Sequence, residues 1–242
     1  TILDLLNELD AQGYDTKAIR AEFFASTTPT PDQILQRVAE NFGKIEDMRA
    51  KMKNWGSAGT KTFPVVERRF LFKKPDKMKF ITPDINRTMI INGDVTFEID
   101  ERGSRSITIS DYTGFSEKQI DFRYHLQEVM NTHNITFTEE QGFNNSIYML
   151  ELTPNEPNII YGKLIIYIDY DKGIDVKTNA FSENGEILFS KETVVSELYK
   201  NIWVPTGYSE KMYFEDGIIE TNTRLEEVEL NTGISDEEFS IP

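Results

Sequence analysis

The two histidines are the first candidates for catalysis or metal binding in this cysteine-free chain. His125 and His133 lie eight positions apart on one predicted helix. Helical metal-binding pairs are spaced four residues apart, so side chains eight apart would point about 80° from each other with two turns between them. His133, near the end of that helix, is better placed to interact with the helix dipole. We therefore expect structural roles for both histidines.

A second candidate is the acidic run that contains Asp169, Asp171 and Asp175. Its carboxylate spacing resembles a calcium loop only superficially, because Ala180 stands where such a loop ends in glutamate. We interpret this run as a hairpin turn. The chain also contains no nucleophile elbow, glycine-rich phosphate loop or zinc-peptidase helix motif. The sequence thus predicts a protein that is not an enzyme, with no catalytic residues, no metal ion and no cofactor.

Composition narrows the function classes further. The 242 residues include 41 acidic and 26 basic side chains, a net charge of −15. This charge disfavours general binding to nucleic acid or to an anionic membrane surface. No apolar stretch reaches the ~18–20 residues of a membrane span. The chain begins at Thr1, and we expect a signal or lipid-anchor segment to have been removed before this residue.

Charge is uneven along the chain. Residues 44–79 contain eleven bases and four acids, a net charge of +7, whereas the other residues together carry −22. Two solvated faces of alternating strands would explain this, and so would a docking surface for an acidic partner or for lipid headgroups. The acidic stretch near the C-terminus is interpreted as a solvated strand edge that discourages edge-to-edge pairing.

Hydrophobic periodicity predicts the elements that position these residues. Residues 1–30 are predicted to form an N-terminal helical extension and linker. Thr30 and Pro31 are typical of a helix start, and an apolar stripe follows from Ile34 to Ile45. Beyond residue 48 the period changes to two, with Asn-Gly and Asp-Gly turns. Strands are predicted at 66–72, 78–80, 95–99, 107–109, 135–137, 146–152, 163–170, 174–181, 187–196, 212–214 and 218–230, with one helix at 121–133.

This order of elements predicts an α+β fold, in which a long curved antiparallel sheet carries helices on one face. Several strands are apolar on both faces, as where Leu164 and Ile166 alternate with Ile165 and Tyr167. An open sheet with helices on one face needs only one apolar side. The excess of apolar residues indicates either strands that are buried on both faces or a cavity that is lined by one face. Such a cavity would suit acyl chains, because each buried CH₂ contributes ~0.8 kcal/mol.

Five segments in order carry a family resemblance. They are the aromatic strand, basic pair, proline and strand of 70–80, the strand, Asn-Gly turn and strand of 88–100, the strand of 148–154 that ends in Leu-Thr-Pro, the stretch 202–206 and the closing segment 231–239. Together they resemble the periplasmic outer-membrane lipoprotein carrier family, LolA/LolB-like. The stretch 202–206 is similar to longer members, which add a C-terminal hairpin.

The resemblance implies an incomplete antiparallel β-barrel with helices over its concave side, formed by residues 31–242 as a single domain, with an acyl-chain cavity between sheet and helices. The candidate lining residues are Phe70, Phe72, Met78, Phe80, Phe97, Leu150, Leu164, Ile166 and Ile168 on strands, with Val38, Phe42, Phe122 and Leu126 on helices.

The resemblance also implies a latch for the covering helix. In the carriers, an arginine before the proline of the first segment bonds to helix-loop carbonyls, and Lys74 stands at the matching position here. Lysine lacks the planar fork of arginine, so a weaker latch is expected. Lys73, Lys77 and Lys79 would complete a basic strip at the barrel rim, available for partner docking.

The leading hypothesis is a non-enzymatic carrier or binding protein for lipid or lipoprotein acyl chains in the cell envelope. Its expected location is extracytoplasmic, in the periplasm or at the cell surface. Its expected partners are a lipid or an acylated lipoprotein and a membrane-anchored donor or acceptor protein, without nucleic acid. The alternative is an envelope module for protein–protein interaction or stress sensing on the same fold, with no lipid transport.

Overall fold

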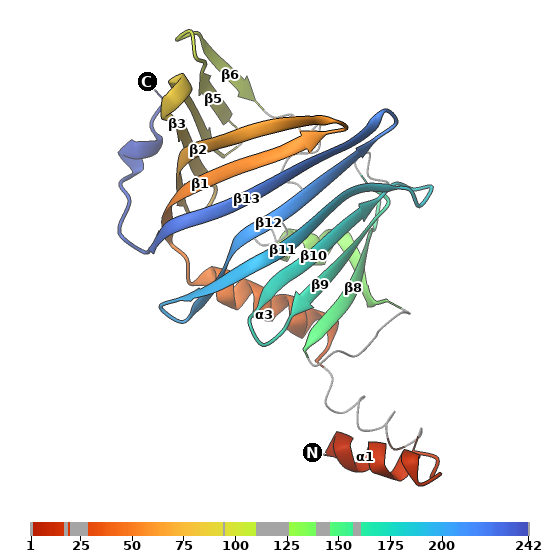
Figure 1. The fold of residues 1–242 in the computed structure, drawn as a ribbon. Helices are drawn as coiled ribbons and strands as arrows, with labels where there is room; N and C mark the ends of the chain where they lie inside the picture. The colour runs from red at the N-terminus through yellow and green to blue at the C-terminus, as the bar shows by residue number, and fades with distance from the viewer. Residues whose placement is uncertain are drawn as a thin grey trace.

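One strongly curved antiparallel sheet dominates the computed structural model, which describes residues 2–16, 19, 29–93, 95–109, 126–138, 146–156 and 161–241 (Figure 1). Its strands are β1 (Asp47–Ala58), β2 (Lys61–Lys73), β3 (Lys77–Thr82), β4 (Arg87–Asn92), β5 (Val95–Ile99), β6 (Arg105–Ile109), β7 (His133–Phe137), β8 (Ile147–Pro154), β9 (Lys163–Asp169), β10 (Ile174–Phe181), β11 (Ile187–Tyr199), β12 (Ile202–Phe214) and β13 (Gly217–Leu230).

The strand order leaves the barrel unclosed. The sheet runs β6-β5-β4-β3-β2-β1-β13-β12-β11-β10-β9-β8-β7, so β6 and β7 lie at its two edges. The first strand pairs with the last, with Met48 opposite Leu230 and Lys53 opposite Arg224. This architecture confirms the predicted α+β incomplete barrel. The strand β13, which carries part of the predicted acidic strand edge, is not an edge strand of the sheet, but only its residues 217–224 pair with β12, and its acidic part from Glu226 to Leu230 pairs with β1.

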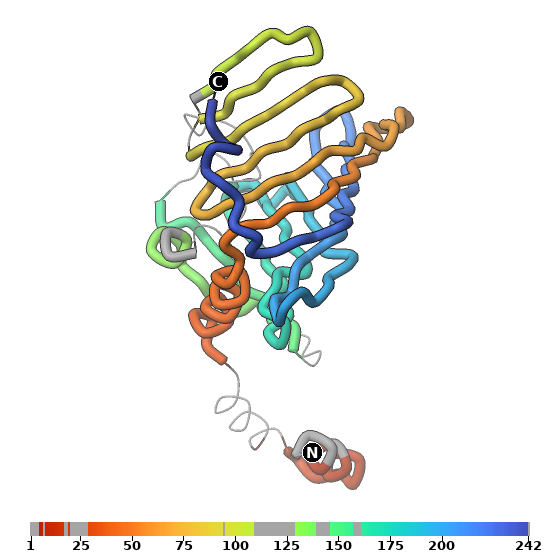
Figure 2. The backbone as a smooth tube through the Cα atoms, turned by 90° about the vertical axis from the view of Figure 1, so that its left-hand side faces the viewer, coloured from red at the N-terminus to blue at the C-terminus, as the bar shows by residue number. Residues whose placement is uncertain are grey.

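The described helices are α1 (Ile2–Ala11), α3 (Pro31–Gly43) and α5 (Leu126–Thr132), with short 3₁₀ helices η1 (Pro83–Ile85) and η2 (Asp236–Phe239). The helices α3 and α5 cover part of the concave side. A capping box starts α3, because the Thr30 side chain accepts from the Gln33 N–H and the Gln33 side chain accepts from the Thr30 N–H. In both views α1 lies apart from the sheet (Figures 1 and 2). The division into an extension at 1–30 and one domain at 31–242 stays a prediction.

The largest differences from the predicted elements occur at β1, β12 and α5, and the ends of several other strands differ by a few residues. The strand β1 was not predicted, although Met48, Ala50 and Met52 alternate with charged residues and lie buried. The strand β12 begins ten residues earlier than predicted and includes Pro205. Pro205 pairs with Ser196 next to a register shift, where a missing N–H is tolerated. The described part of the predicted helix 121–133 is α5, and His133 already belongs to β7.

Candidate ligand-binding site

Side chains from the helix α3 fill one half of the concave face. The buried stripe of this helix, Ile34, Leu35 and Val38, packs onto the β7–β10 half of the sheet, and Val129 and Met130 of α5 join the same cluster. The other buried members of the cluster are Leu150, Leu152, Tyr161, Leu164, Ile166, Ile168, Ala180 and Phe189. Most of these side chains have no solvent exposure, so this half of the barrel has the dense packing of an ordinary protein core.

The other half of the concave face is hollow. It contains a cavity of about 560 Å³ between the end of α3 and strands β1–β5 and β11–β13, within the ~300–1,000 Å³ typical of small-molecule sites. The apolar wall consists of Ala39, Phe42, Ile45, Met48, Met52, Phe70, Phe72, Met78, Phe80, Met89, Ile91, Val204, Pro205 and Leu225. Four of these side chains are methionines, whose flexible thioethers adapt to irregular ligands.

Five of the candidate lining residues lie together in this wall. Phe70 and Phe72 come from β2, Met78 and Phe80 from β3, and Phe42 from the C-terminal end of α3. The rings of Phe70 and Phe80 lie in contact, with their centroids 5.1 Å apart. Phe42 packs against both the filled cluster and the cluster around the cavity, so it marks the border between the two halves.

The remaining candidates lie elsewhere or outside the described residues. Val38, Leu150, Leu164, Ile166 and Ile168 belong to the filled half and do not line this cavity. Alternation places the four strand residues on the concave face as predicted, but α3, which carries Val38, covers that part of the sheet.

Phe97 is buried, but the prediction that it lines the cavity on the concave face is wrong. Phe97 pairs with Ile90, which pairs with Lys79, and Lys79 has the opposite parity to Met78 and Phe80. It therefore faces the convex side, where it packs with Ile90, Ile234 and Phe239. Phe122 lies outside the described residues, and for Leu126 only the backbone, in α5, is described.

The end of the cavity far from α3 is polar. Arg68 of β2, Asn54 of β1, Tyr208 of β12 and Lys191 of β11 line it. The Asn54 amide nitrogen donates to Thr223 Oγ1 at 2.8 Å. The sequence analysis missed these residues, although Arg68 shares its parity with Phe70 and Phe72, a pattern that would have placed it on the same face.

Hydrogen bonds from Arg37 and Asn41 fix the C-terminal half of α3 to the sheet. The buried Asn41 side chain donates to the Trp203 carbonyl at 2.7 Å and accepts from the Trp203 N–H at 3.0 Å. Arg37 donates to the carbonyl oxygens of Tyr170 and Asp171 at 3.3 and 3.1 Å. Gly173 follows in the same hairpin with a φ of +66°, and a Cβ at this position would lie 2.7 Å from the backbone carbonyl oxygen of Arg37. The predicted hairpin turn after Asp169 is thereby confirmed and serves as a docking point for α3.

Lys74 contacts the last residue of the same helix, just beyond Asn41. Its ammonium donates to the carbonyl of Gly43, the last residue of α3, and lies 3.3 Å from a Glu46 carboxylate oxygen. The Lys74–Pro75 peptide bond is cis, and both residues line the cavity. A lysine thus makes the kind of contact that the family resemblance implied for its arginine.

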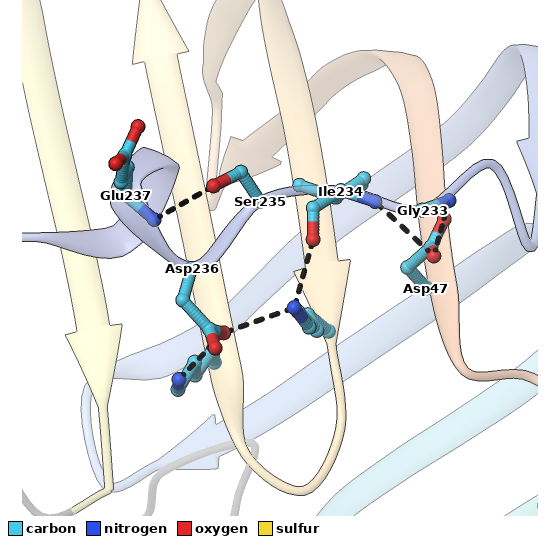
Figure 3. Close-up of polar contacts among 8 residues, drawn as sticks. Asp47, Gly233, Ile234, Ser235, Asp236 and Glu237 are labelled. Atoms are coloured by element: carbon cyan, nitrogen blue, oxygen red, sulfur yellow. Dashed lines mark hydrogen bonds and ion pairs between the residues drawn. The ribbon is translucent and has the colours of Figure 1, made fainter.

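The convex side is crossed by the C-terminal segment 231–241, here called the strap (Figure 2). The strap is anchored on Asp47, whose carboxylate accepts from the N–H groups of Thr232, Gly233 and Ile234 at 2.8, 2.9 and 3.3 Å (Figure 3). Burial raises the pKa of Asp47, but these hydrogen bonds lower it by more, so the pKa lies below its ordinary value.

The strap also occupies the predicted basic strip. Lys73 and Lys77 contact the Asp236 carboxylate at 3.0 and 2.8 Å, and Lys79 lies 3.3 Å from Glu238 (Figure 3 shows Asp236). Hydrogen bonds from Lys77 and Lys73 hold the pKa of Asp236 below its usual value. These three lysines bind the chain's own acidic segment on the convex side, whereas Lys74 contacts the helix.

Among the candidates for chemistry, His133 makes structural contacts. His133 Nδ1 lies 3.2 Å from the Val129 carbonyl in the last turn of α5, as expected for a contact with the helix end. Because a carbonyl only accepts, Nδ1 carries the proton, and Nε2 accepts from the Tyr161 hydroxyl at 2.9 Å. Burial lowers the pKa of His133 and raises that of Tyr161 to about 12. No cluster of three or more metal-ligating side chains occurs among the described residues. His125 lies outside them.

Solved structures with the same architecture support this description of the fold. A DUF1329 family protein from Desulfovibrio piger superposes with a TM-score of 0.68 at 13% identity, over 88% of this chain and 98% of that one. A LolA superfamily protein from Nitrosomonas europaea gives 0.64 at 13% identity, over 88% and 99%. An outer membrane lipoprotein-sorting protein domain from Vibrio parahaemolyticus gives 0.62 at 16% identity, over 86% and 97%.

Fold and cavity together define a LolA-like half-barrel with a partly hollow interior, which confirms the resemblance predicted from five short segments. A family model described only as "uncharacterized protein" matches residues 69–241, and the chain belongs to that family. No curated protein sequence matches the chain. In the part of the chain that the structure describes, no helix has the length and apolar character needed to cross a bilayer.

Proposed function

We propose that this protein is a non-enzymatic carrier or binding protein for the acyl chains of a lipid or an acylated lipoprotein. The supporting observation is the cavity of about 560 Å³, whose wall is aliphatic, aromatic and thioether on the side next to α3. Each CH₂ group moved from water into such a wall contributes ~0.8 kcal/mol. Affinity would therefore come from apolar burial and would need no reaction chemistry.

The attachments of α3 suggest how a ligand enters and leaves. Asn41 and Arg37 tie the helix to the sheet through backbone groups of β12 and of the β9–β10 turn. On the cavity side, contacts from Lys74 to Gly43 and Glu46 hold the chain where α3 ends. Loss of these contacts would free the chain beyond Asn41, including Phe42 at the cavity, while Arg37 and Asn41 keep the rest of the helix in place.

The location we propose is extracytoplasmic, in the periplasm or at the cell surface, with a membrane-anchored protein as donor or acceptor. Support comes from the LolA-like fold that the chain shares with a domain named for outer membrane lipoprotein sorting. The alternative function is a module that only docks a partner protein. The basic segment 44–79 gives it little support. Lys73, Lys77 and Lys79 in that segment are already bound by the strap.

Uptake of a fluorescent fatty acid by the delipidated protein tests this proposal. Phe72→Glu places a carboxylate in the apolar wall, where desolvation of the charge opposes both the fold and the ligand. Met78→Glu makes the same change at a half-buried wall position and serves if the first variant folds poorly. The matched control is Val65→Glu, because Val65 lies on the same strand, is 59% exposed and does not line the cavity.

We expect saturable uptake by the wild type and by Val65→Glu, and loss of uptake in both wall variants. Uptake unchanged in a folded wall variant would contradict the carrier proposal. A partner retained in a pull-down regardless of lipid, together with no uptake by the wild type, would instead favour the docking module.

A further inference from the structure

The turn between the helix α3 and the strand β1 contributes to the cavity wall. The helix ends at Gly43 and the strand begins at Asp47, so residues 44–46, here called the α3–β1 turn, belong to neither element. Gly43 and Ile45 line the cavity, and Ile45 is only 4% exposed. Backbone groups between two elements must find partners elsewhere in the protein or in water. The partners of this turn therefore determine how firmly this part of the wall is held.

Asn231, the first residue of the strap, binds the α3–β1 turn on both sides of Ile45. Its side-chain nitrogen donates to the Lys44 carbonyl at 2.8 Å, and its side-chain oxygen accepts from the Glu46 N–H at 2.8 Å. The same oxygen lies 3.4 Å from the Asp47 nitrogen, and the Asn231 N–H donates to the Asp47 carbonyl at 2.9 Å. One residue thus supplies partners for the backbone directly before and directly after a wall residue.

These contacts require an asparagine at position 231. Its short side chain carries a donor and an acceptor, and only this orientation of the amide pairs the oxygen with N–H groups and the nitrogen with a carbonyl. An aspartate would lack the donor. The backbone φ of Asn231 is +56°, in the left-handed region that asparagine adopts more readily than most other residues. Side-chain chemistry and backbone conformation therefore favour the same residue type.

Lys74 binds the same turn from the residue that follows β2. Its ammonium donates to the Gly43 carbonyl, and its N–H donates to the Glu46 carbonyl at 3.0 Å. Neither carbonyl is one that Asn231 binds, so the contacts of the two residues add to each other. The backbone around the turn is thus held by a lysine next to it in the sheet and by an asparagine from the far end of the chain.

We propose that Asn231 is a positioning residue that sets the rate at which the cavity opens, acting through the α3–β1 turn together with Lys74. This inference rests on the proposed acyl-chain function and gives the strap a part in ligand exchange. The strap crosses the convex side and meets the turn at its first residue (Figure 2). When the two side-chain bonds break, Ile45 is free to move away from the ligand, while Arg37 and Asn41 still hold the helix.

Stopped-flow kinetics of a fluorescent fatty acid test this assignment. Entry into the delipidated full chain and release to excess phosphatidylcholine vesicles are measured separately. Asn231→Gly removes the side-chain bonds and keeps a residue that tolerates the positive φ. Because Asn231 is exposed, water replaces the lost partners and the fold is retained. Asn231→Asp, which keeps the acceptor and loses the donor, is the conservative variant.

The matched control is the same substitution at another asparagine. Asn86 also has a positive φ, +50°, at the end of the short helix η1. It is exposed and does not line the cavity. Asn86→Gly therefore reproduces the change in residue type and backbone freedom without touching the α3–β1 turn.

We expect Asn231→Gly to speed both entry and release about three- to fivefold, a change of about one hydrogen bond in the opening barrier. Because a lower barrier speeds both directions, Kd should stay within about twofold. Asn231→Asp should lie between this variant and the wild type, and Asn86→Gly should match the wild type. In hydrogen exchange followed by mass spectrometry, the peptide that contains residues 43–47 should exchange faster in Asn231→Gly, whereas β8–β10 should be unchanged.

The contrary results are distinct. Faster release with unchanged entry would mean that Asn231 stabilises the bound state and does not control opening, which overturns the assignment. Unchanged rates in both directions, an equal acceleration in Asn86→Gly, or faster hydrogen exchange throughout the sheet would overturn it as well, and each leaves the acyl-chain proposal intact. Absence of saturable binding by the wild type would instead contradict the proposed function itself.

Discussion

A phenylalanine introduced into each half of the concave face would distinguish the hollow half from the filled half. Ala39 lines the cavity at its border with the filled cluster, whereas Ala180 has no exposure and lies inside that cluster under α3. The same change, alanine to phenylalanine, therefore probes both halves. Burying a phenylalanine ring in empty space gains ~1.5–3 kcal/mol. Forcing it into a packed core costs ~1–3 kcal/mol.

For Ala39→Phe, which is half-buried in the native protein, we expect the free energy of unfolding to rise by about 1–2 kcal/mol. A domain of this size shifts its melting temperature by ~2–4 °C per kcal/mol, so Tm should rise by about 2–8 °C. Ala180→Phe should lower Tm by at least about 2 °C. Ala39→Phe should also lose fatty-acid uptake, because its ring takes the ligand's place.

Calorimetric unfolding of delipidated protein is the assay, since a bound lipid would raise the wild-type Tm by mass action. The informative quantity is the sign of the Tm change in each variant. If Ala39→Phe destabilises the protein as much as Ala180→Phe does, the space under the end of α3 is filled, and the distinction between the two halves is wrong.

Three further predictions concern the contacts that hold the strap and the helix α3. Asp47→Asn should lower the free energy of unfolding by ~2–3 kcal/mol at pH 7, because the carboxylate's bonds to the strap are charge-assisted. The native pKa of Asp47 is depressed, so its stabilisation is present above the unfolded-state pKa and is lost as pH falls through the native pKa. The difference between the urea titrations of the two proteins should therefore begin to shrink below about pH 4 and vanish only below the native pKa, and a pH-independent difference would refute this. Gly173→Ala should cost ~1–3 kcal/mol from its positive φ and the close Arg37 oxygen; an unchanged urea midpoint would mean that the turn does not support α3. Lys74→Ala should change stability by less than ~1 kcal/mol, since the lysine and its carboxylate partner are partly exposed. Stopped-flow release of a fluorescent fatty acid should nevertheless be up to about fivefold faster, and an unchanged release rate would remove Lys74 as a latch.

Local patterns predicted most of the fold. The capping residues Thr30 and Pro31 gave the correct start of α3, and the alternation over 174–181 gave β10 with its observed bounds. Turn dipeptides located the hairpins because Gly93, Gly185 and Gly217 adopt the positive φ angles that such turns need. The strand β1 was missed because its apolar positions are methionine and alanine, which are weak strand formers, although the period of two is present.

The site was only partly predictable, because periodicity tells which residues share a face and not what covers that face. Phe72 and Ile166 both point to the concave side, but only Phe72 faces the cavity, since α3 covers Ile166. The face of Phe97 depends on the register across β3, β4 and β5, which no single strand specifies. Lys77 pairs with Asp236, which lies 159 residues later in the chain, so no local pattern could predict this contact.

Native mass spectrometry of the gently purified protein tests the central claim most directly, which is that the uncovered half of the barrel holds an acyl chain. We predict a population that carries the mass of one acyl-bearing molecule, that loses it on delipidation and that is missing from Ala39→Phe. A wild-type protein that is found only at its own chain mass, and that stays so after incubation with fatty acid, would contradict the account.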